Sequence, residues 1–123
     1  MARLNTRYAL KMTHLKYKRG DVYWVNLDPT IGSEIKKTRP AVIISNNVQN
    51  MVGHRIIVAP MTSTVHKVYP FEVLIHLEGK KSKVMLDQIR TMDCARLGGK
   101  LGRLSAEELD ILDKVLKLVL SLS

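Results

Sequence analysis

The sequence is poor in cysteine and in long apolar runs, and both absences exclude classes of protein. Its 123 residues contain one cysteine, Cys94, so an internal disulfide bond is impossible, as is usual in a reducing compartment. No apolar run approaches the roughly 18 residues that span a bilayer. The basic N-terminus has no continuous hydrophobic stretch of the kind that a secretory signal contains. We therefore expect a cytoplasmic protein without a membrane association.

The charge of the chain is strongly positive but unevenly distributed. The formal net charge is +9, and six of the 20 Lys and Arg residues fall within the first 20 residues, where there is no acid. This leaves 14 basic against 11 acidic residues for the rest of the chain. We predict a flexible basic arm at residues 1–17 and one domain at residues 18–123. A basic balance favours polyanionic partners, nucleic acid first.

Short segments rich in β-branched residues predict a compact antiparallel β-barrel. Pro60 should mark a bulge or an edge of the third strand. Residues 78–81 are interpreted as a turn and the glycine-rich residues 95–103 as a connection. The predicted strands are residues 21–27, 41–46, 54–63 and 71–77, and a bent strand with a short successor within 83–94.

The C-terminus has the pattern of an amphipathic helix. Ser105 and Glu108 stand three residues apart, as in a capping box. Leucine and valine then recur at spacings of three and four, which places them on one face. We expect this helix to pack on the barrel.

Several site chemistries lack their sequence signals. The four histidines have no H-x-x-x-H spacing, no G-x-S-x-G occurs, and residues 95–103 lack the lysine-serine ending of a P-loop. We expect no metal and no cofactor, and we interpret Cys94 as a core residue.

Arginine, hydroxyl and carboxylate groups stand at predicted strand ends and loops. Arg39 precedes Pro40, which favours an extended backbone and a fixed guanidinium, the group that best matches phosphate oxygens. Glu34, Thr62 and Asp87 lie on other loops or strand ends. This set suits metal-free RNA cleavage, in which the substrate's own 2′-OH attacks phosphorus and the protein supplies a base and positive charge.

The same residues also have a purely structural interpretation. Glu34 could form a solvated ion pair with Lys36 or Lys37, and such pairs contribute little to stability. Arg39 could brace its loop, and Thr62 and Asp87 could be turn formers.

Four sequence blocks, in order along the chain, favour the functional interpretation over the structural one. The sequence resembles the MazF/PemK family of toxin endoribonucleases over residues 18–122, with a terminal helix after the last block. The blocks are "RGDVYWVNLDPTIGSEIKKTRPAVIISN", "VAPMTST", "YPFEV" and "LDQIRTMDCARL".

The resemblance implies a mainly β fold, an SH3-like antiparallel barrel with a C-terminal helix, assembled as a homodimer. It implies metal-independent cleavage of single-stranded RNA in a groove along the dimer interface, leaving a 2′,3′-cyclic phosphate and a 5′-OH. It also implies a cognate antitoxin whose flexible acidic tail occupies that groove.

The resemblance also implies site residues. Arg39 and Thr62 match the family's catalytic arginine and threonine, and Glu34 or Asp87 is the candidate general base, with the choice left open. Some members have a histidine at the position of Ser33 and an arginine at the position of Met85. The roles of acid and of charge stabilisation that these side chains have in those members therefore cannot be filled in the same way here. The candidate RNA-binding residues are Ser33, Lys36, Lys37, His66, Gln88 and Arg90.

Two other classes of function remain open at the level of the sequence. One is a gyrase-binding toxin of the CcdB type, and the other is a non-catalytic SH3-like module that binds nucleic acid.

Overall fold

The computed structural model describes residues 15–34 and 37–123. Within this part of the chain, short strands precede a single long helix. The elements are β1 (Asp21–Asn26), β2 (Thr38–Ile43), α2 (Asn47–Val52), β3 (Arg55–Thr62), β4 (Glu72–Leu77), β5 (Lys80–Met85), η2 (Leu86–Gln88), β6 (Arg90–Asp93), η3 (Cys94–Arg96), β7 (Leu97–Arg103) and α3 (Ala106–Val119).

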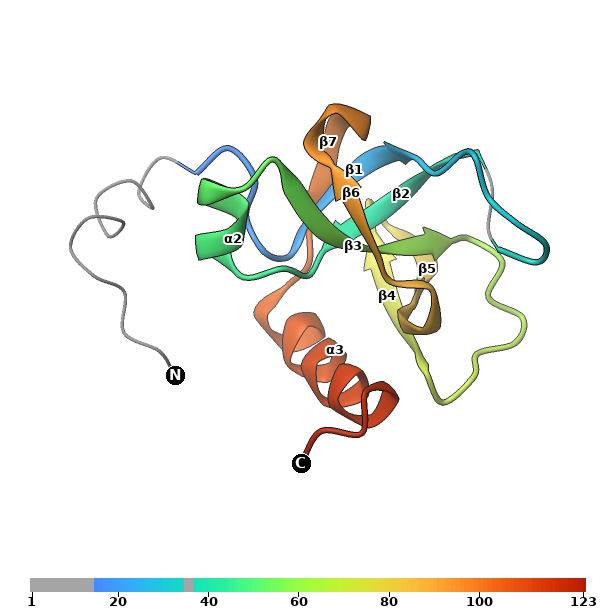
Figure 1. Cartoon of the computed structure of the whole chain (residues 1–123). Helices are drawn as coiled ribbons and strands as arrows, with labels where there is room; N and C mark the ends of the chain where they lie inside the picture. Colours follow the sequence, from blue (N-terminus) through green and yellow to red (C-terminus); the bar gives the residue numbers. More distant parts are fainter. Residues whose placement is uncertain (1–14, 35–36) are drawn as a thin grey trace.

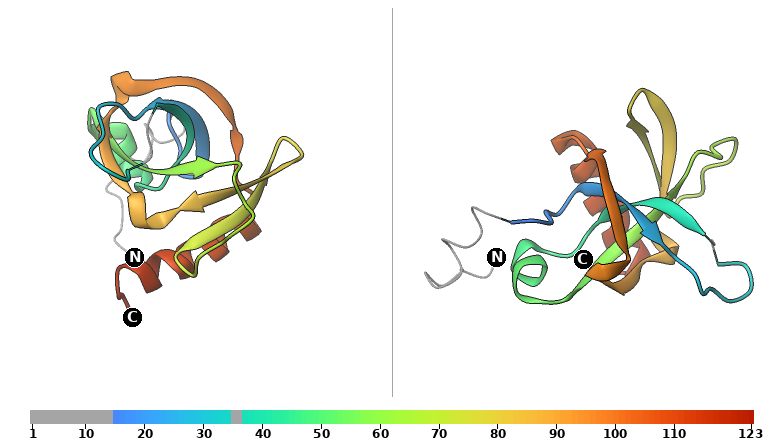
Figure 2. Two further views of the ribbon diagram at one scale, coloured as in Figure 1. Left: turned by 90° about the vertical axis from the view of Figure 1, so that its right-hand side faces the viewer. Right: turned by 90° about the horizontal axis from the view of Figure 1, so that it is seen from above.

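The strands form one antiparallel sheet that curls into a half-barrel (Figures 1 and 2). Its order is β4-β5-β3-β2-β1-β7, and β6 pairs with the first half of β3. The second edge partner of β3 is β5, which pairs with Met61 and Thr62. Pro60 lies between the stretch of β3 that pairs with β6 and the stretch that pairs with β5. Proline has no N–H, and at this position no neighbouring strand needs one for a ladder hydrogen bond. The predicted mainly β barrel with a terminal helix is confirmed.

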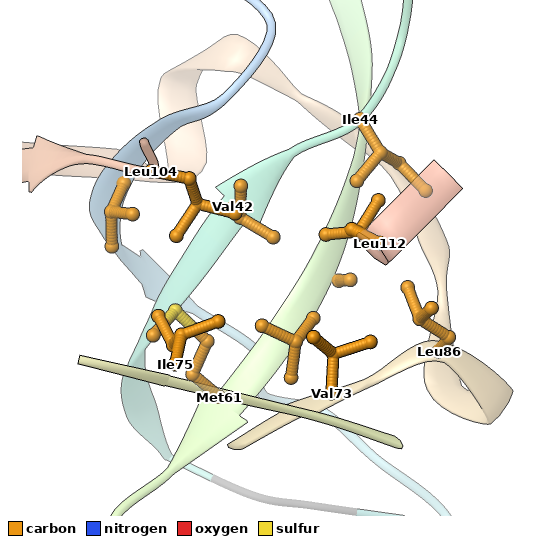
Figure 3. Packing of buried hydrophobic residues seen from close by; sticks show 11 residues of the cluster. Val42, Ile44, Met61, Val73, Ile75, Leu86, Leu104 and Leu112 are labelled. Atoms are coloured by element: carbon orange, nitrogen blue, oxygen red, sulfur yellow. The ribbon is translucent and has the colours of Figure 1, made fainter. Parts of the chain in front are cut away.

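Two apolar clusters lie on opposite faces of the central strands. One gathers between β2, β3, β4 and α3, and it includes Val42, Met61 and Leu112 (Figure 3). The other includes Val25, Ala41 and Val58 and is covered by β6. The alternation of strand side chains sends successive residues to different clusters, so the central strands are buried on both faces.

The helix α3 begins at the predicted capping box. The Ser105 hydroxyl accepts from the N–H of Glu108, and the Glu108 carboxylate accepts from the N–H of Ser105. That carboxylate also accepts from the backbone N–H of His76 in β4 at 3.0 Å. Burial alone would raise the pKa of Glu108, but these hydrogen bonds lower it below its ordinary value. Glu108 therefore joins the start of α3 to the sheet.

Two local predictions were wrong, and one short helix was not predicted. Residues 97–103 are strand β7 and not a connection. The glycine at position 98 allows the strands to approach, because a Cβ there would lie 3.3 Å from the Cβ of Trp24. Residues 47–52 form α2, with Asn46 as its N-cap accepting from Gln49. Strand β5 begins at Lys80, inside the predicted turn.

The described N-terminal residues pack on the domain. The Tyr23 hydroxyl donates to the carbonyl of Lys16 at 3.1 Å, and the rings of Tyr17 and Tyr23 meet edge to face. The Arg19 guanidinium pairs with Asp113 of α3 at 2.7 Å. Most of the predicted arm, residues 1–14, lies outside the described residues. In the part of the chain described here, no helix is both long and apolar enough to cross a membrane.

Candidate active site

A cleft of about 370 Å³ opens at the end of the half-barrel where β2 begins and β3 ends. Its lining is mainly apolar and includes the side chains of Pro40, Met61 and Leu101. Two segments leave the sheet at this end, residues 27–37 between β1 and β2 and residues 63–71 between β3 and β4 (Figures 1 and 2). The described lining residues are Trp24, Lys37, Thr38, Arg39, Pro40, Met61, Thr62, Ser63, Leu77, Glu78, Lys80, Ser82 and Leu101.

Arg39 and Thr62 lie together at this cleft. The β2–β3 ladder pairs Ala41 with Pro60, and continuing that register by two residues places Thr62 opposite Arg39. The ladder itself ends at Ala41 and Pro60, so the two residues lie just beyond it and on the same face by alternation. Both residues are half-buried and line the cleft. The strand register therefore brings a guanidinium and a hydroxyl to one side of one opening.

The Thr62 hydroxyl already has an acceptor role. It accepts from the backbone N–H of Thr64 at 3.2 Å. A hydroxyl that accepts one hydrogen bond keeps its own proton for donation. Thr62 can thus donate to an oxygen of a bound phosphate.

The two candidate bases lie in a different hollow. Glu34, Asp87, Gln88 and Arg90 line a second depression of about 150 Å³. Neither Glu34 nor Asp87 is among the described residues that line the first cleft. Within one copy of the chain, the predicted catalytic residues are therefore split into two pairs.

The segment that contains Glu34 is held at its root by β6 and η3. Arg90 donates to the carbonyl of Leu27 at 2.8 Å, and Arg96 donates to the carbonyl of Asn26 at 3.3 Å. The N–H of Lys37 donates to the Asp28 carboxylate at 3.1 Å. Arg90 thus has a structural contact in addition to its place in the second hollow.

The Glu34 side chain is engaged within its own segment. Its carboxylate accepts from the N–H of Ile31 at 2.6 Å, and its N–H donates to the carbonyl of Ile31 at 3.2 Å. This pair of bonds forms a tight turn beyond the root. The carboxylate is exposed and keeps further lone pairs for a ligand.

The remaining predicted residues differ in their positions. Lys37 lines the cleft beside Arg39. Ser33 and His66 are exposed, one on each segment that leaves the sheet. Lys36 lies outside the described residues.

Three residues of the cleft were missed from the sequence. Trp24 is 41% exposed and lines the cleft, although its apolar strand suggested a core position. Glu78 and Lys80 reach the cleft from the β4–β5 hairpin. Strand alternation would not have marked the exposed ring, because Val22, two residues away and on the same face by alternation, is fully buried. No signal in the sequence marks Glu78, which is the one carboxylate among the described lining residues.

The charge of the cleft favours an anion. Three cationic residues, Lys37, Arg39 and Lys80, stand against the single acid Glu78. Cationic groups beside an apolar lining suit a ligand with both phosphate and a flat ring, as in a nucleotide chain.

A metal site and a reactive cysteine find little support in the described residues. No three His, Cys, Asp or Glu side chains among them lie close enough to hold a metal ion together. Burial raises the pKa of the Cys94 thiol, and the charge of Asp93 adds to this effect. Cys94 packs against the second apolar cluster, as expected for a structural residue.

Comparison with known proteins shows the family of the chain. Residues 18–120 match the family described as the PemK-like, MazF-like toxin of type II toxin–antitoxin systems. The endoribonuclease MazF9 of Mycobacterium tuberculosis is 42% identical over 114 residues, which cover 85% of this chain and 97% of that protein. The endoribonuclease EndoA of Bacillus subtilis is 35% identical over 111 residues, covering 85% and 95%.

Solved structures have the same fold. The crystal structure of MazF from Deinococcus radiodurans has a TM-score of 0.75 and 30% identity, and the match covers 85% of this chain and 96% of that one. A crystal structure of MazE-MazF from the same organism has a TM-score of 0.68 and 27% identity, with coverage of 89% and 98%.

Proposed function

The chain belongs to the PemK-like, MazF-like family of type II toxin–antitoxin toxins, and we propose that it cuts single-stranded RNA at the cleft of Arg39 and Thr62. The relatives that are 42% and 35% identical are endoribonucleases, and this activity is the one that the chain shares with its family. The observation that carries the choice of site is that Arg39 and Thr62 line the same cationic opening. Growth arrest then follows from the loss of intact mRNA.

The chemistry is an internal transesterification without a metal ion. The 2′-oxygen of the substrate forms a bond to phosphorus while the bond from phosphorus to the 5′-oxygen breaks. The 2′-OH proton passes to a carboxylate, and the leaving 5′-oxygen takes a proton from water. The protonated carboxylate then returns its proton to the hydroxide that this water leaves, so the products are a 2′,3′-cyclic phosphate and a 5′-OH and the enzyme is unchanged.

Arg39 stabilises the charge that develops on the phosphorane. A guanidinium is always protonated at neutral pH, so its contribution is electrostatic and directional. Thr62 donates its hydroxyl proton to a second phosphate oxygen. Groups fixed before the reaction, as these are by two paired strands, stabilise a transition state without reorganising.

The base is a carboxylate, Glu34 or Asp87, in the second hollow. For either to serve the cleft of Arg39, the RNA must extend across both hollows or the segment of Glu34 must shift. Glu78 of the cleft itself is a third candidate that the geometry adds. These three carboxylates can be separated by mutation.

Other charged and polar residues bind the RNA strand. Lys37 lies on the rim of the cleft, Gln88 and Arg90 line the second hollow, and Ser33 and His66 lie on the flanking segments. Lys36 is assigned the same role from the sequence alone. Phosphate contacts of this kind supply affinity that is shared among many groups and falls with salt.

We further propose two protein partners in the cytoplasm. One is a cognate antitoxin with a flexible acidic tail, supported by the +9 charge and by the MazE-MazF structure of the Deinococcus relative. The other is a second copy of the chain. The exposed apolar residues of α3, among them Ile111 at 50% and Leu118 at 65%, suit such a homodimer. Sedimentation at micromolar concentration should give a dimer, and a species of one chain mass would reject it.

Incubation of mixed RNA with the protein in excess EDTA tests the function. We expect cutting to persist, with 5′-OH ends that polynucleotide kinase labels without prior phosphatase treatment. Cutting that needs added Mg²⁺ and leaves 5′-phosphate ends would reject the chemistry. Binding of RNA without cutting would favour the non-catalytic module, and gyrase inhibition without either would favour the CcdB type.

A further inference from the structure

A buried ion pair underlies the segment that joins β3 to β4. The Lys83 ammonium lies 3.0 Å from the Glu72 carboxylate, and the two side chains are only 11% and 5% exposed. Lys83 lies in β5 and Glu72 begins β4. No part of the proposed chemistry uses either residue.

Both members of the pair also bond to the backbone of that segment. Lys83 donates to the carbonyl of Lys67 at 2.8 Å. The Glu72 carboxylate accepts from the N–H of Tyr69 at 2.8 Å, and the N–H of Glu72 donates to the carbonyl of Tyr69 at 2.9 Å. The buried ion pair therefore anchors residues 67–69 to strands β4 and β5.

The attached residues present a flat, cationic surface. The rings of Tyr69 and Phe71 are stacked at 5.2 Å with an angle of 3° between their planes. The ammonium of Lys67 lies 4.7 Å from the centre of the Tyr69 ring, and that ring residue is 41% exposed. An aromatic ring with a cation beside it is the usual platform for an unpaired nucleobase and its phosphate.

The platform is connected directly to the candidate active site. The segment begins immediately after Thr62 and Ser63, which line the cleft, and the β3–β5 register places Lys83 opposite Thr62. In the views of Figures 1 and 2 it leaves the same end of the sheet as residues 27–37. A base on Tyr69 would thus belong to the same RNA strand whose phosphate lies at Arg39.

Stability alone does not explain the pair. Burying two charges costs several kcal/mol of hydration, and apolar residues of the same volume in place of such a pair are often neutral or stabilising. Apolar side chains could not bond to the carbonyl of Lys67 and the N–H of Tyr69. What the charged pair adds over an apolar pair is a fixed position for the segment.

We propose that the Glu72–Lys83 pair determines which RNA sequence is cut, by holding Tyr69 as the stacking platform for a nucleobase near the scissile phosphate. The base stacks on the outer face of the ring and takes the place of the Lys67 ammonium, which then pairs with the flanking phosphate. Glu72 and Lys83 are positioning residues, since they act through Tyr69 and do not touch RNA. This inference rests on the proposed RNA cleavage.

The test is a competition in one tube. Sequencing of the ends that the parent protein produces first identifies its preferred site. Two labelled RNAs, one with that site and one with a single base changed, are then cut together in EDTA. Their ratio of kcat/KM does not depend on the fraction of enzyme that is folded, so a merely structural role would leave it unchanged.

The variants separate the pair from its surroundings. Lys83→Met removes the ammonium at similar length, and Glu72→Gln removes the charge while keeping an acceptor for Tyr69. The double variant Lys83→Met with Glu72→Leu removes both charges, and it keeps the test open if a single buried charge prevents folding. Tyr69→Leu removes the platform itself. Lys81→Met is the matched control, an exposed lysine two residues from Lys83 on the same strand.

We expect the ratio, measured for a purine changed to a pyrimidine, to fall about fivefold in Lys83→Met, the double variant and Tyr69→Leu, because the preference that stacking strength gives is modest and most of the lost stacking lowers kcat/KM for both RNAs. Glu72→Gln should fall less, and the Lys81→Met ratio should stay within about twofold of the parent, because a surface lysine contributes little. A ratio unchanged in the folded Lys83 variants overturns the inference while leaving the proposed function intact. A parent that cuts no RNA overturns both.

Discussion

Arg39 and Thr62 are placed by strand pairing, whereas Glu34 and Asp87 are placed by a loop turn and the short helix η2. The first pair lies on two central strands that also contribute fully buried residues, such as Ala41 and Val58. The second pair is exposed, and Glu34 is held by bonds to Ile31 in its own segment. The cation and hydroxyl therefore have the rigidity of the core, and the carboxylates have the freedom of the surface.

This difference divides the reaction into a fixed part and an adjustable part. Charge stabilisation needs groups that are already in place, because reorganisation costs free energy at the moment of reaction. A base must meet the 2′-OH only after the strand is bound, and apo distances to such groups often tighten in the complex. The separation of the two hollows is compatible with that order of events.

The largest effect should come from one of the carboxylates. If it is the base, its amide variant, Glu34→Gln or Asp87→Asn, should cut RNA about 10²–10⁴-fold more slowly, the usual contribution of a general base. The other variant, and Glu78→Gln of the cleft, should change the rate far less. Single-turnover rates between acidic and alkaline pH provide the measurement, since loss of the base should also remove the acidic limb of the pH profile.

If Glu78→Gln alone slowed RNA cleavage by this factor, the division into a rigid pair and an adjustable pair of catalytic residues would not hold. It would place the base in the cleft with Arg39 and leave Glu34 and Asp87 as structural residues. Circular dichroism of each variant is the control, because these exposed side chains should not change the fold.

A smaller effect is expected at Thr62. Thr62→Val keeps the branched shape and removes the hydroxyl, and it should slow cutting roughly 10–100-fold, as for one lost hydrogen bond to a charged group. Thr62→Ser should restore most of the rate. A Thr62→Val protein that cuts RNA at the parent rate would indicate that the hydroxyl has no part in the reaction.

The smallest effect concerns Glu108, a carboxylate held by local N–H groups as Glu34 is. Because its pKa is lowered in the folded state, its contribution to stability is full above the ordinary value near 4.5 and is lost as the pH falls through the lowered value. Between neutral and acidic pH, the free energy of unfolding of Glu108→Gln should therefore fall by about 0.3–1 kcal/mol less than that of the parent. Urea unfolding at several pH values would measure it, with Glu107→Gln of the same helical turn as the control.

The sequence was sufficient for the elements that depend on local signals. Residue alternation and the capping box of Ser105 and Glu108 predicted most strands and the start of α3, because those signals act between neighbours. Strand β7 was missed, since its glycines have low strand propensity and Gly98 is explained by the approach of Trp24 from β1. The short helix α2 was missed because six residues show too little periodicity.

The candidate site could be predicted only in part, because its geometry depends on residues that are far apart in the sequence. Its residues were found one by one, from their chemistry and predicted positions and then through the resemblance to a family. That Arg39 and Thr62 meet while Glu34 and Asp87 lie apart depends on strand register and on chain closure over tens of residues, which local patterns do not contain. The Glu72–Lys83 pair is an exception to the rule that charged residues of strands face solvent.

The most direct test of the account is the separation of binding from cutting at Arg39. Arg39→Ala should slow single-turnover cleavage by roughly 10²–10³-fold, the range for one lost donor to a developing charge. Binding of an uncleavable 2′-deoxy substrate should fall far less, because one phosphate contact is among many. Arg39→Lys should recover little, since lysine lacks the planar two-donor fork. A folded Arg39→Ala protein that cuts RNA at the parent rate would contradict the account and remove Thr62 from the site with it.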